Sequence, residues 1–290
     1  SLGALPKQSE EQVVRTVKEQ WGLGLIRSWN EEGWIDAPQR LGRKIAPLIG
    51  AGDNEVIVAD STSVNLFKLL VSAARLRPRR SVILSEAGNF PTDLYIVQGV
   101  QGLLERLELR LVPRKAISDS IDRNVAAVLL THVDFRSSQV FDMSEITARA
   151  HEQGAMVVWD LSHSTGSMPI DLRANDVDFA VGCGYKYLNG GPGSPGYLFV
   201  AERHQSTLSQ PITGWMGHAK PFDFNLEYRA HPSLSRALSG TPPIISLAAF
   251  EAALELWRDV DLQLLRDKSV AMSELFLRLV ETECAGLGLR

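Results

Sequence analysis

The sequence predicts an α/β fold with a mainly parallel sheet of the seven-stranded type, covered by helices on both faces. Short runs of apolar and β-branched residues alternate along the chain with longer segments of helical periodicity. The short runs are apolar on both faces, which is typical of parallel strands buried between two helical layers. The expected strands are Val56–Ala59, Ser81–Ser85, Leu107–Val112, Val125–Leu130, Ala155–Trp159, Phe179–Gly182 and Tyr197–Val200.

Helical periodicity fills most of the remaining chain. The expected helices are Glu10–Trp29, Asp36–Ile49, Ser63–Leu76, Pro91–Gly99, Met143–Gln153, Pro243–Trp257 and Leu262–Glu283. We expect residues 1–257 to form a large ligand-binding domain and residues 258–290 to begin a smaller C-terminal domain. The last helix is amphipathic and needs a packing partner, so a further C-terminal segment is expected, and the N-terminus also looks incomplete.

Composition and charge exclude several classes of protein. The chain has 290 residues, is 44% hydrophobic and 22% charged, and carries a formal net charge of −4. Both signs of charge are interspersed, so neither a nucleic-acid partner nor a membrane partner is indicated. The two cysteines provide no disulfide framework, and the six histidines include no H-E-x-x-H motif, so we expect a cytoplasmic protein without a metal site.

Polar residues that directly follow the apolar strands are the candidates for a functional site. In a parallel sheet, ligands bind outside the carboxyl ends of the strands. Asp60, Thr131, Asp160 and Lys186 each lie at or just beyond such an end, as does the segment Glu86–Asp93. We expect their side chains to converge.

Lys186 and Asp160 form the strongest chemical signal. Lys186 follows an apolar segment and precedes a glycine-rich turn, which suits an amine that reacts with a carbonyl group. Asp160 ends the preceding strand and could pair with the pyridine nitrogen of pyridoxal phosphate. Alone, each residue has an ordinary interpretation, as a surface lysine or as a turn-capping aspartate. Their order at successive strand ends favours the cofactor.

Two further segments fit the same cofactor. Ser61-Thr-Ser63 offers hydroxyls and backbone N–H groups at a helix N-terminus, where phosphate binds, although an N-cap alone would also explain it. Phe90 could stack on a cofactor ring and Asp93 adds a carboxylate, but both could also belong to a proline-initiated helix. Gly190–Gly196 lacks the spacing of a known phosphate loop, and Ser162-His163 lacks a nucleophile elbow.

Several collinear motifs resemble bacterial kynureninase, a fold-type-I pyridoxal-phosphate enzyme of the class-V aminotransferase superfamily. The resemblance runs over nearly the whole chain. The motifs are Ser1-Leu-Gly, Gly24-Leu-Ile-Arg-Ser-Trp-Asn30, Asp60-Ser-Thr-Ser-Val-Asn-Leu-Phe-Lys68, Asn89-Phe-Pro-Thr-Asp-Leu-Tyr95, Thr131-His-Val-Asp-Phe135, Trp159-Asp-Leu-Ser-His163, Gly184-Tyr-Lys-Tyr-Leu-Asn-Gly-Gly-Pro-Gly193 and Ser239-Gly-Thr-Pro-Pro-Ile244.

The resemblance implies a role for each matching residue. Lys186 would hold the cofactor covalently, Asp160 would pair with the pyridine nitrogen, and Asp93 would be the third catalytic residue. The cofactor pocket would comprise Thr62, Ser63, Phe90, Asp93, Thr131, Asp160, His163, Tyr185, Lys186 and Trp215, together with Thr241 from a partner subunit. Ser1 and Trp29 would lie near the aromatic end of the substrate, and Trp29 suggests kynurenine rather than its 3-hydroxy derivative.

The resemblance further implies a homodimer that hydrolyses L-kynurenine to anthranilate and L-alanine, in tryptophan catabolism, the kynurenine pathway and NAD biosynthesis. An arginine in the C-terminal domain would hold the substrate carboxylate. The segment 133–138 departs from the family pattern, with Asp134 in place of asparagine and Ser138 in place of glycine. The alternatives are another fold-type-I enzyme, such as a cysteine desulfurase, and a homologue without catalytic activity.

Overall fold

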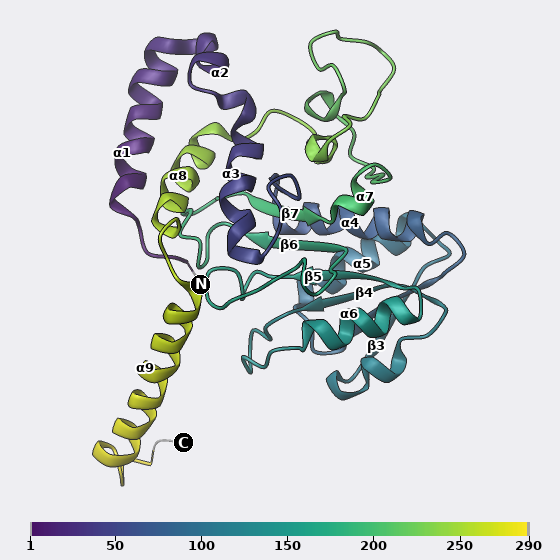
Figure 1. Cartoon of the computed structure of the whole chain (residues 1–290), viewed down its shortest axis with the longest axis vertical. Helices are drawn as coiled ribbons and strands as arrows, with labels where there is room; N and C mark the ends of the chain where they lie inside the picture. Colours follow the sequence, from purple (N-terminus) through teal and green to yellow (C-terminus); the bar gives the residue numbers. More distant parts are fainter. Residues whose placement is uncertain (1, 289–290) are drawn as a thin grey trace.

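A computed structural model describes residues 2–288, and it has one seven-stranded sheet between two layers of helices (Figure 1). The strands are β1 (Val56–Val58), β2 (Val82–Glu86), β3 (Glu108–Val112), β4 (Val125–Thr131), β5 (Met156–Asp160), β6 (Phe179–Cys183) and β7 (Gly196–Val200). Their order in the sheet is β1-β7-β6-β5-β4-β2-β3. Only β7 runs against the direction of the other six strands, so the prediction of a mainly parallel sheet is confirmed.

Two separate hydrophobic cores lie on the two faces of this sheet. One face packs against α3 (Ala37–Ile45), α6 (Met143–Glu152) and α8 (Ile244–Leu254). The other packs against α4 (Thr62–Leu76), α5 (Pro91–Leu103) and the segment 208–238. Successive residues of one strand contribute to opposite cores, as the side-chain alternation of a strand requires. This double burial explains why the strands are continuous apolar runs.

The N-terminal helical segment differs from the predicted Glu10–Trp29. It consists of α1 (Lys7–Arg15), a π-helical stretch (Thr16–Gly24), a 3₁₀ turn (Leu25–Arg27) and the short α2 (Ser28–Glu31). Leu25 has a φ of 50°, which no regular right-handed helix allows. The prediction of one continuous helix is therefore wrong, because Gly22 and Gly24 favour a break that the apolar spacing conceals.

Two other predicted helices end in a tighter turn. Asp36–Ile49 is divided into α3 and a 3₁₀ segment (Ala46–Ile49), because Pro47 cannot donate the hydrogen bond that an α-helix needs. Pro243–Trp257 is divided into α8 and the 3₁₀ turn Glu255–Trp257. The short helix α7 (Glu202–Gln205) was not predicted, since four residues carry no periodicity.

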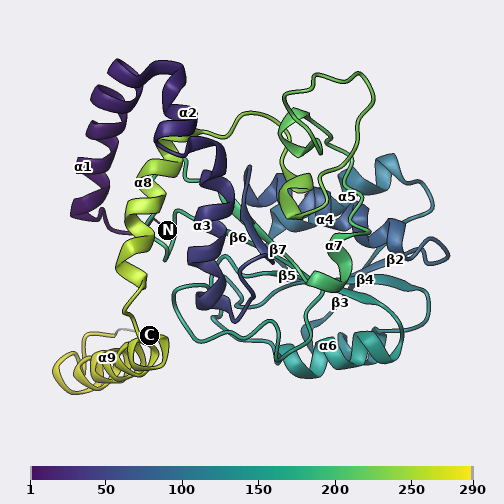
Figure 2. The same cartoon turned by 45° about the horizontal axis from the view of Figure 1, so that its top comes forward.

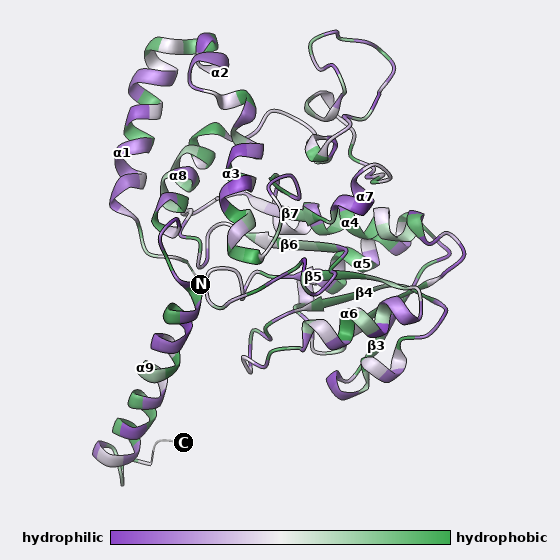
Figure 3. Ribbon diagram, viewed as in Figure 1, coloured by the Kyte–Doolittle hydropathy of each residue, from purple (hydrophilic) through white to green (hydrophobic). Residues whose placement is uncertain are grey.

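The helix α9 (Leu262–Glu283) projects away from the sheet and its helices (Figure 2). None of its residues is buried, and hydrophobic and hydrophilic residues alternate along it (Figure 3). By contrast, β4 and β5 are hydrophobic along their lengths in the same view. Within residues 2–288, every helix is too short or too polar to span a bilayer.

Candidate active site

Five of the sequence-predicted residues meet at one edge of the sheet, at or beyond the carboxyl ends of β2, β5 and β6. Nζ of Lys186 lies 2.8 Å from Nε2 of His163, and 6.0 Å from the centroid of the Phe90 ring. Asp160 and Asp93 are almost fully buried, and the carboxyl group of Asp93 interacts electrostatically with both Asp160 and Lys186. The structure thus brings together an amine, an imidazole, an aromatic ring and two carboxyl groups.

Adjacent parallel strands explain this convergence. The last residues of β4 and β5 pair directly, Thr131 with Asp160, and Asp160 pairs in turn with Val181 of β6. Side chains at the ends of these three strands therefore share one edge of the sheet. The backbone N–H of Ser162 donates to Oδ1 of Asp160 at 2.7 Å, while Oδ2 accepts no hydrogen bond from residues 2–288. One carboxylate oxygen is left for a ligand.

Asp93 is held in a buried polar network. Its Oδ2 accepts a hydrogen bond from Oγ1 of Thr131 at 3.2 Å and from Nδ2 of Asn89 at 3.5 Å. Oδ1 of Asn89 accepts in turn from the backbone N–H of Thr131 at 3.0 Å. Burial, reinforced by the charge of Asp160, raises the pKa of Asp93 well above its ordinary value. Asn89 was given no role from sequence, although it stands one turn before Asp93 on the same side.

His163 is kept in its neutral form. Burial and the positive charge of Lys186 lower its pKa. A neutral imidazole has one ring nitrogen free to accept, so Nε2 can accept a hydrogen bond from the Lys186 ammonium. The pair can therefore share a proton without placing a second positive charge beside Lys186.

The N-terminus of α4 faces the same edge of the sheet from β1. Oγ of Ser61 caps the helix by accepting from the backbone N–H of Val64 at 3.3 Å. The backbone amides of Thr62 and Ser63 have no acceptor among residues 2–288. Oγ1 of Thr62 donates to the carbonyl of Gly182 at 3.3 Å. Free amides beside hydroxyls make this helix end suitable for an anionic group.

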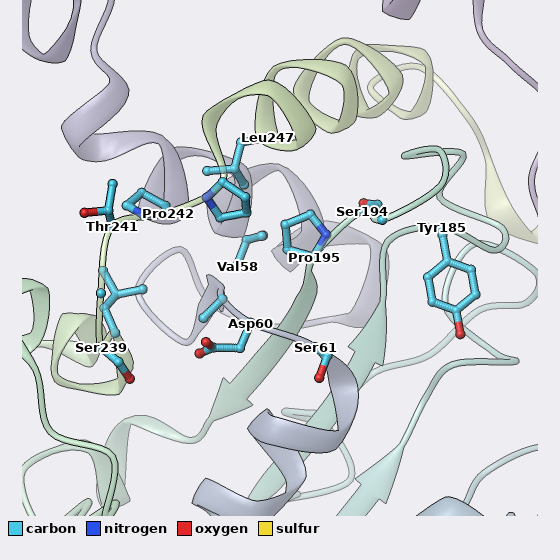
Figure 4. Close-up of a pocket in the computed structure, with 15 residues that line it drawn as sticks. Val58, Asp60, Ser61, Tyr185, Ser194, Pro195, Ser239, Thr241, Pro242 and Leu247 are labelled. Atoms are coloured by element: carbon cyan, nitrogen blue, oxygen red, sulfur yellow. The ribbon is translucent and has the colours of Figure 1, made fainter. Parts of the chain in front are cut away.

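A cavity of about 580 Å³ opens beside these residues (Figure 4). Its walls come from the β1–α4 turn, from residues 184–195, which carry Lys186 and are called the lysine loop below, and from the segment Leu238–Pro243. The lining residues include Asp60, Ser61, Tyr185, Ser194, Ser239 and Thr241. Thr241 thus faces the same cavity as Ser61 within one chain, whereas the resemblance implied that it comes from a partner subunit.

Two predicted residues lie apart from the amine of Lys186 within the chain. Trp29 lies in α2, at the opposite end of α1 from the lysine loop, and its ring packs edge-on against Trp34 at 6.0 Å (Figure 1). Trp215 packs against Phe222 at 5.9 Å and lines a different cavity. Ser1 lies outside the described residues. The backbone N–H of Gly3 donates to the carbonyl of Tyr185 at 2.9 Å.

The segment 133–138 covers Phe90 at the mouth of the site. Phe135 packs edge-on against Phe90 at 5.3 Å. Oδ1 of Asp134 accepts hydrogen bonds from the backbone of Arg136 and Ser137, which lowers the pKa of Asp134 despite its partial burial. Ser138 has a φ of 58°, a left-handed conformation. The two residues that depart from the family pattern, Asp134 and Ser138, therefore belong to one closed turn. In this turn the carboxylate of Asp134 is hydrogen-bonded to the backbone of the turn itself.

These residues fit pyridoxal phosphate by the chemistry of their donors. The cofactor presents an aldehyde, a pyridine nitrogen and a phosphate, which need an amine, a carboxylate and anion-binding amides. Lys186, Asp160 and the N-terminus of α4 supply these groups around one edge of the sheet, and Phe90 offers a ring face. Within residues 2–288, no group of three or more His, Cys, Asp or Glu side chains is arranged so that it could hold a metal ion.

Comparison with known proteins identifies the family. Residues 30–282 match the family described as Aminotransferase class-V. The chain is 45% identical to a kynureninase of Burkholderia mallei (strain SAVP1), over all of this chain and 71% of that protein. It is 48% identical to a kynureninase of Deinococcus radiodurans, over 97% of this chain and 70% of that protein.

Solved structures with much lower identity share the fold. C-DES, in a form with glycine covalently linked to its PLP cofactor, has a TM-score of 0.83 at 18% identity, covering 97% of this chain and 76% of its own. The cysteine desulfurase CsdA of Escherichia coli has a TM-score of 0.77 at 18% identity, covering 96% and 71%. The fold, the sequence match and the donor set agree, and the chain belongs to the kynureninase family, whose members are hydrolases that depend on pyridoxal phosphate.

Proposed function

We propose that this chain hydrolyses L-kynurenine to anthranilate and L-alanine with pyridoxal phosphate as cofactor. The observation that carries the proposal is the 45–48% identity to kynureninases over essentially the whole chain. The cluster of Lys186, Asp160 and His163 at one edge of the sheet supports it, because these groups suit the same cofactor.

In this proposal the bound cofactor supplies an electron sink for the carbanion that forms when the substrate loses its α-proton. Lys186 would hold the cofactor through Nζ, and the same amine, once free, would take up the α-proton of the substrate. Asp160 would pair with the pyridine nitrogen of the cofactor and keep it protonated. Neutral His163 accepts a hydrogen bond from Nζ and so orients the amine.

The remaining pocket residues bind and orient. Thr62 and Ser63 offer amides and hydroxyls to the phosphate, and Phe90 covers one face of the ring. Asp93 and Thr131 form a rigid buried pair beneath the site, in which the raised pKa of Asp93 limits the negative charge next to Asp160. Tyr185 closes the side toward the cavity.

We further propose that a second copy of the chain completes the site. Within one chain Trp29 and Trp215 pack against Trp34 and Phe222, and both are at least partly exposed. A homodimer would allow such residues to reach the substrate of the neighbouring subunit. We also propose that the enzyme prefers kynurenine to 3-hydroxykynurenine and acts in tryptophan catabolism and NAD biosynthesis. The same proposal includes a cytoplasmic location and a domain boundary near residue 257.

A desulfurase activity requires a reactive cysteine, and neither cysteine suits this role. Cys183 is buried, and its burial raises the pKa of the thiol, which disfavours the nucleophilic thiolate. Cys284 lies at the end of α9. The kynureninase assignment is therefore preferred within this fold.

The test is anthranilate fluorescence after L-kynurenine is mixed with the cofactor-loaded protein. Parallel reactions contain 3-hydroxykynurenine or cysteine, and a Lys186→Ala variant serves as the inactive control. Anthranilate with an equal amount of alanine supports the proposal. A yellow, cofactor-loaded protein that releases no product from either kynurenine would instead favour the homologue without catalytic activity.

A further inference from the structure

Lys68 is a fully buried lysine in the middle of α4. Its side chain is 1% exposed, and its Nζ lies 2.6 Å from Oδ2 of Asp60 and 2.6 Å from the carbonyl oxygen of Ala237. A buried ammonium is costly unless it is paired and hydrogen-bonded. Lys68 therefore fixes the positions of both partners. Asp60 lines one wall of the 580 Å³ cavity, and Ala237 directly precedes Leu238, which lines another wall.

The first partner, Asp60, forms a constrained turn directly before α4. It has a φ of 43°, in the left-handed region that is unfavourable for a residue with a side chain. Its carbonyl accepts a hydrogen bond from the backbone N–H of Gly196 at 2.7 Å, which joins the turn to the start of β7. Asp60 immediately precedes Ser61, the N-cap of α4. Its conformation thus sets the direction in which the first amides of the helix point.

The carboxylate of Asp60 also creates an electrostatic problem. Its side chain is 34% exposed and lines the cavity beside the N-terminus of α4. An unpaired negative charge there would repel the anion that the helix end attracts. The ammonium of Lys68 offsets this charge from inside the protein.

The second partner connects the opposite wall. Ala237 lies next to Leu238, and the segment Leu238–Pro243 forms the side of the cavity that faces the β1–α4 turn (Figure 4). One ammonium group therefore ties the helix start to the wall across the cavity.

We propose that Lys68 is a positioning residue for the phosphate of the cofactor. It neutralises Asp60 and holds the left-handed turn, so that the amides of Thr62 and Ser63 present an anion site free of an opposing charge. The inference rests on the proposed function, because it takes the N-terminus of α4 as the place where the phosphate binds.

The test compares pyridoxal phosphate with pyridoxal, which lacks the phosphate but keeps the ring and the aldehyde. Dissociation constants of both are measured by absorbance for the wild type, Lys68→Met and the double variant Lys68→Met/Asp60→Asn. Ser72→Ala is the matched control, since Ser72 is equally buried on the same helix and, among residues 2–288, its hydroxyl hydrogen-bonds only with the backbone carbonyl of Lys68.

A role in phosphate binding predicts a selective loss. In Lys68→Met the affinity for pyridoxal phosphate falls at least about tenfold, while the affinity for pyridoxal changes less than about twofold. The double variant, which removes both charges, recovers most of the preference for the phosphorylated form, and Ser72→Ala keeps the wild-type preference. Equal loss of both ligands in Lys68→Met, or no recovery in the double variant, would overturn the inference.

Two more variants separate the possible failures. If Lys68→Met does not fold, Asp60→Asn is the remaining test, because it removes the negative charge and leaves the positive charge of Lys68. Its preference for the phosphorylated form should be at least that of the wild type. A reduced preference would contradict the inference. Thr62→Pro/Ser63→Ala tests the underlying placement, since it removes the amide of residue 62 and both hydroxyls, and proline fits the first position of a helix. If that variant keeps the full preference for phosphate, the phosphate binds elsewhere and the proposed site is wrong. If it loses the preference while Lys68→Met retains it, only the role of Lys68 is wrong.

Discussion

Nζ of Lys186 and Nε2 of His163 lie 2.8 Å apart, although the two residues belong to loops that follow different strands. The contact exists because β5 and β6 are parallel neighbours, with Asp160 paired to Val181, so both loops leave the sheet at the same edge. The lowered pKa of His163 makes the imidazole an acceptor, not a competing cation. This pair is the geometric centre of the proposed chemistry.

Lys186→Ala should abolish covalent attachment of the cofactor, since no other amine in the described chain lies beside Asp160 and Phe90. The measurement is the intact mass after the cofactor-loaded protein is reduced with borohydride. Lys115→Ala, at an exposed position, should retain the added mass. A reduced adduct of unchanged yield in Lys186→Ala would remove this lysine from the mechanism.

Asp93→Asn should stabilise the cofactor-free protein increasingly as the pH rises. Burial and the charge of Asp160 raise the pKa of Asp93, so the folded state holds its proton more tightly than the unfolded chain does. The wild type is therefore most stable, relative to the variant, below the ordinary pKa of 3.8, and loses stability as the pH rises toward the folded pKa. Melting temperatures between pH 4 and pH 8 test this, with exposed Asp119→Asn as the control. A difference that does not depend on pH would contradict it.

Asp178→Asn should destabilise the fold by about 3 kcal/mol, because it breaks a buried charge network. Asp178 lies just before β6 and accepts hydrogen bonds from His151 at 2.9 Å and His204 at 2.7 Å. Urea unfolding measures the change. Asp176→Asn is the matched control: Asp176 shares His151 but is 67% exposed, so its loss should cost less than about 1 kcal/mol. Similar losses in both variants would argue against a special role for the buried carboxylate.

The same network predicts a pH window. Burial opposes ionisation of Asp178, but the histidine hydrogen bonds prevail and lower its pKa, so its contribution is lost as the pH falls below its ordinary 3.8. The hydrogen bond to Asp178 raises the pKa of His151, so that contribution is lost as the pH rises above its ordinary 6.5. The stabilisation relative to Asp178→Asn should therefore be largest between these two values.

Ser138→Gly should stabilise the protein by about 0.5–1 kcal/mol, because glycine adopts the φ of 58° at this position without a steric penalty. Ser137→Gly should do the opposite, since the Ser137 hydroxyl donates to Oδ1 of Asp134 at 2.7 Å. Thermal unfolding of both variants distinguishes conformational strain from a general effect of adding glycine. Equal effects of the two substitutions would show that the strain at Ser138 is negligible.

The strands and the residues at their ends were predictable because a strand that is buried on both faces is a continuous run of apolar residues in the sequence. Val125–Thr131 and Met156–Asp160 are continuous apolar runs that end in a polar residue, so the parallel-sheet rule was enough to place Thr131 and Asp160 at one edge. Lys186 could be placed there by the same argument.

Other features could not be predicted, since they depend on contacts distant in sequence. Nothing in Val56–Val58 indicates that β1 pairs with β7, some 140 residues later, or that this strand pair is antiparallel. The ion pair of Lys68 and Asp60 spans only two helical turns, but its value depends on Ala237 and on the depth of burial. Only the resemblance suggests a role for Trp29 and Trp215, and within one chain they pack against Trp34 and Phe222.

The pairing of β1 with β7 has a consequence for the order of folding. The strands β6 and β7 are separated only by residues 184–195, whereas β1 must pair with a strand some 140 residues later before its register with β7 is fixed. Contacts between residues so far apart in sequence form slowly, because a long loop must close first. The helix start that follows β1 therefore reaches the lysine loop only when the sheet is complete. We expect refolding chains to gain affinity for the phosphorylated cofactor in the last kinetic phase, which makes cofactor absorbance a direct signal that folding has finished.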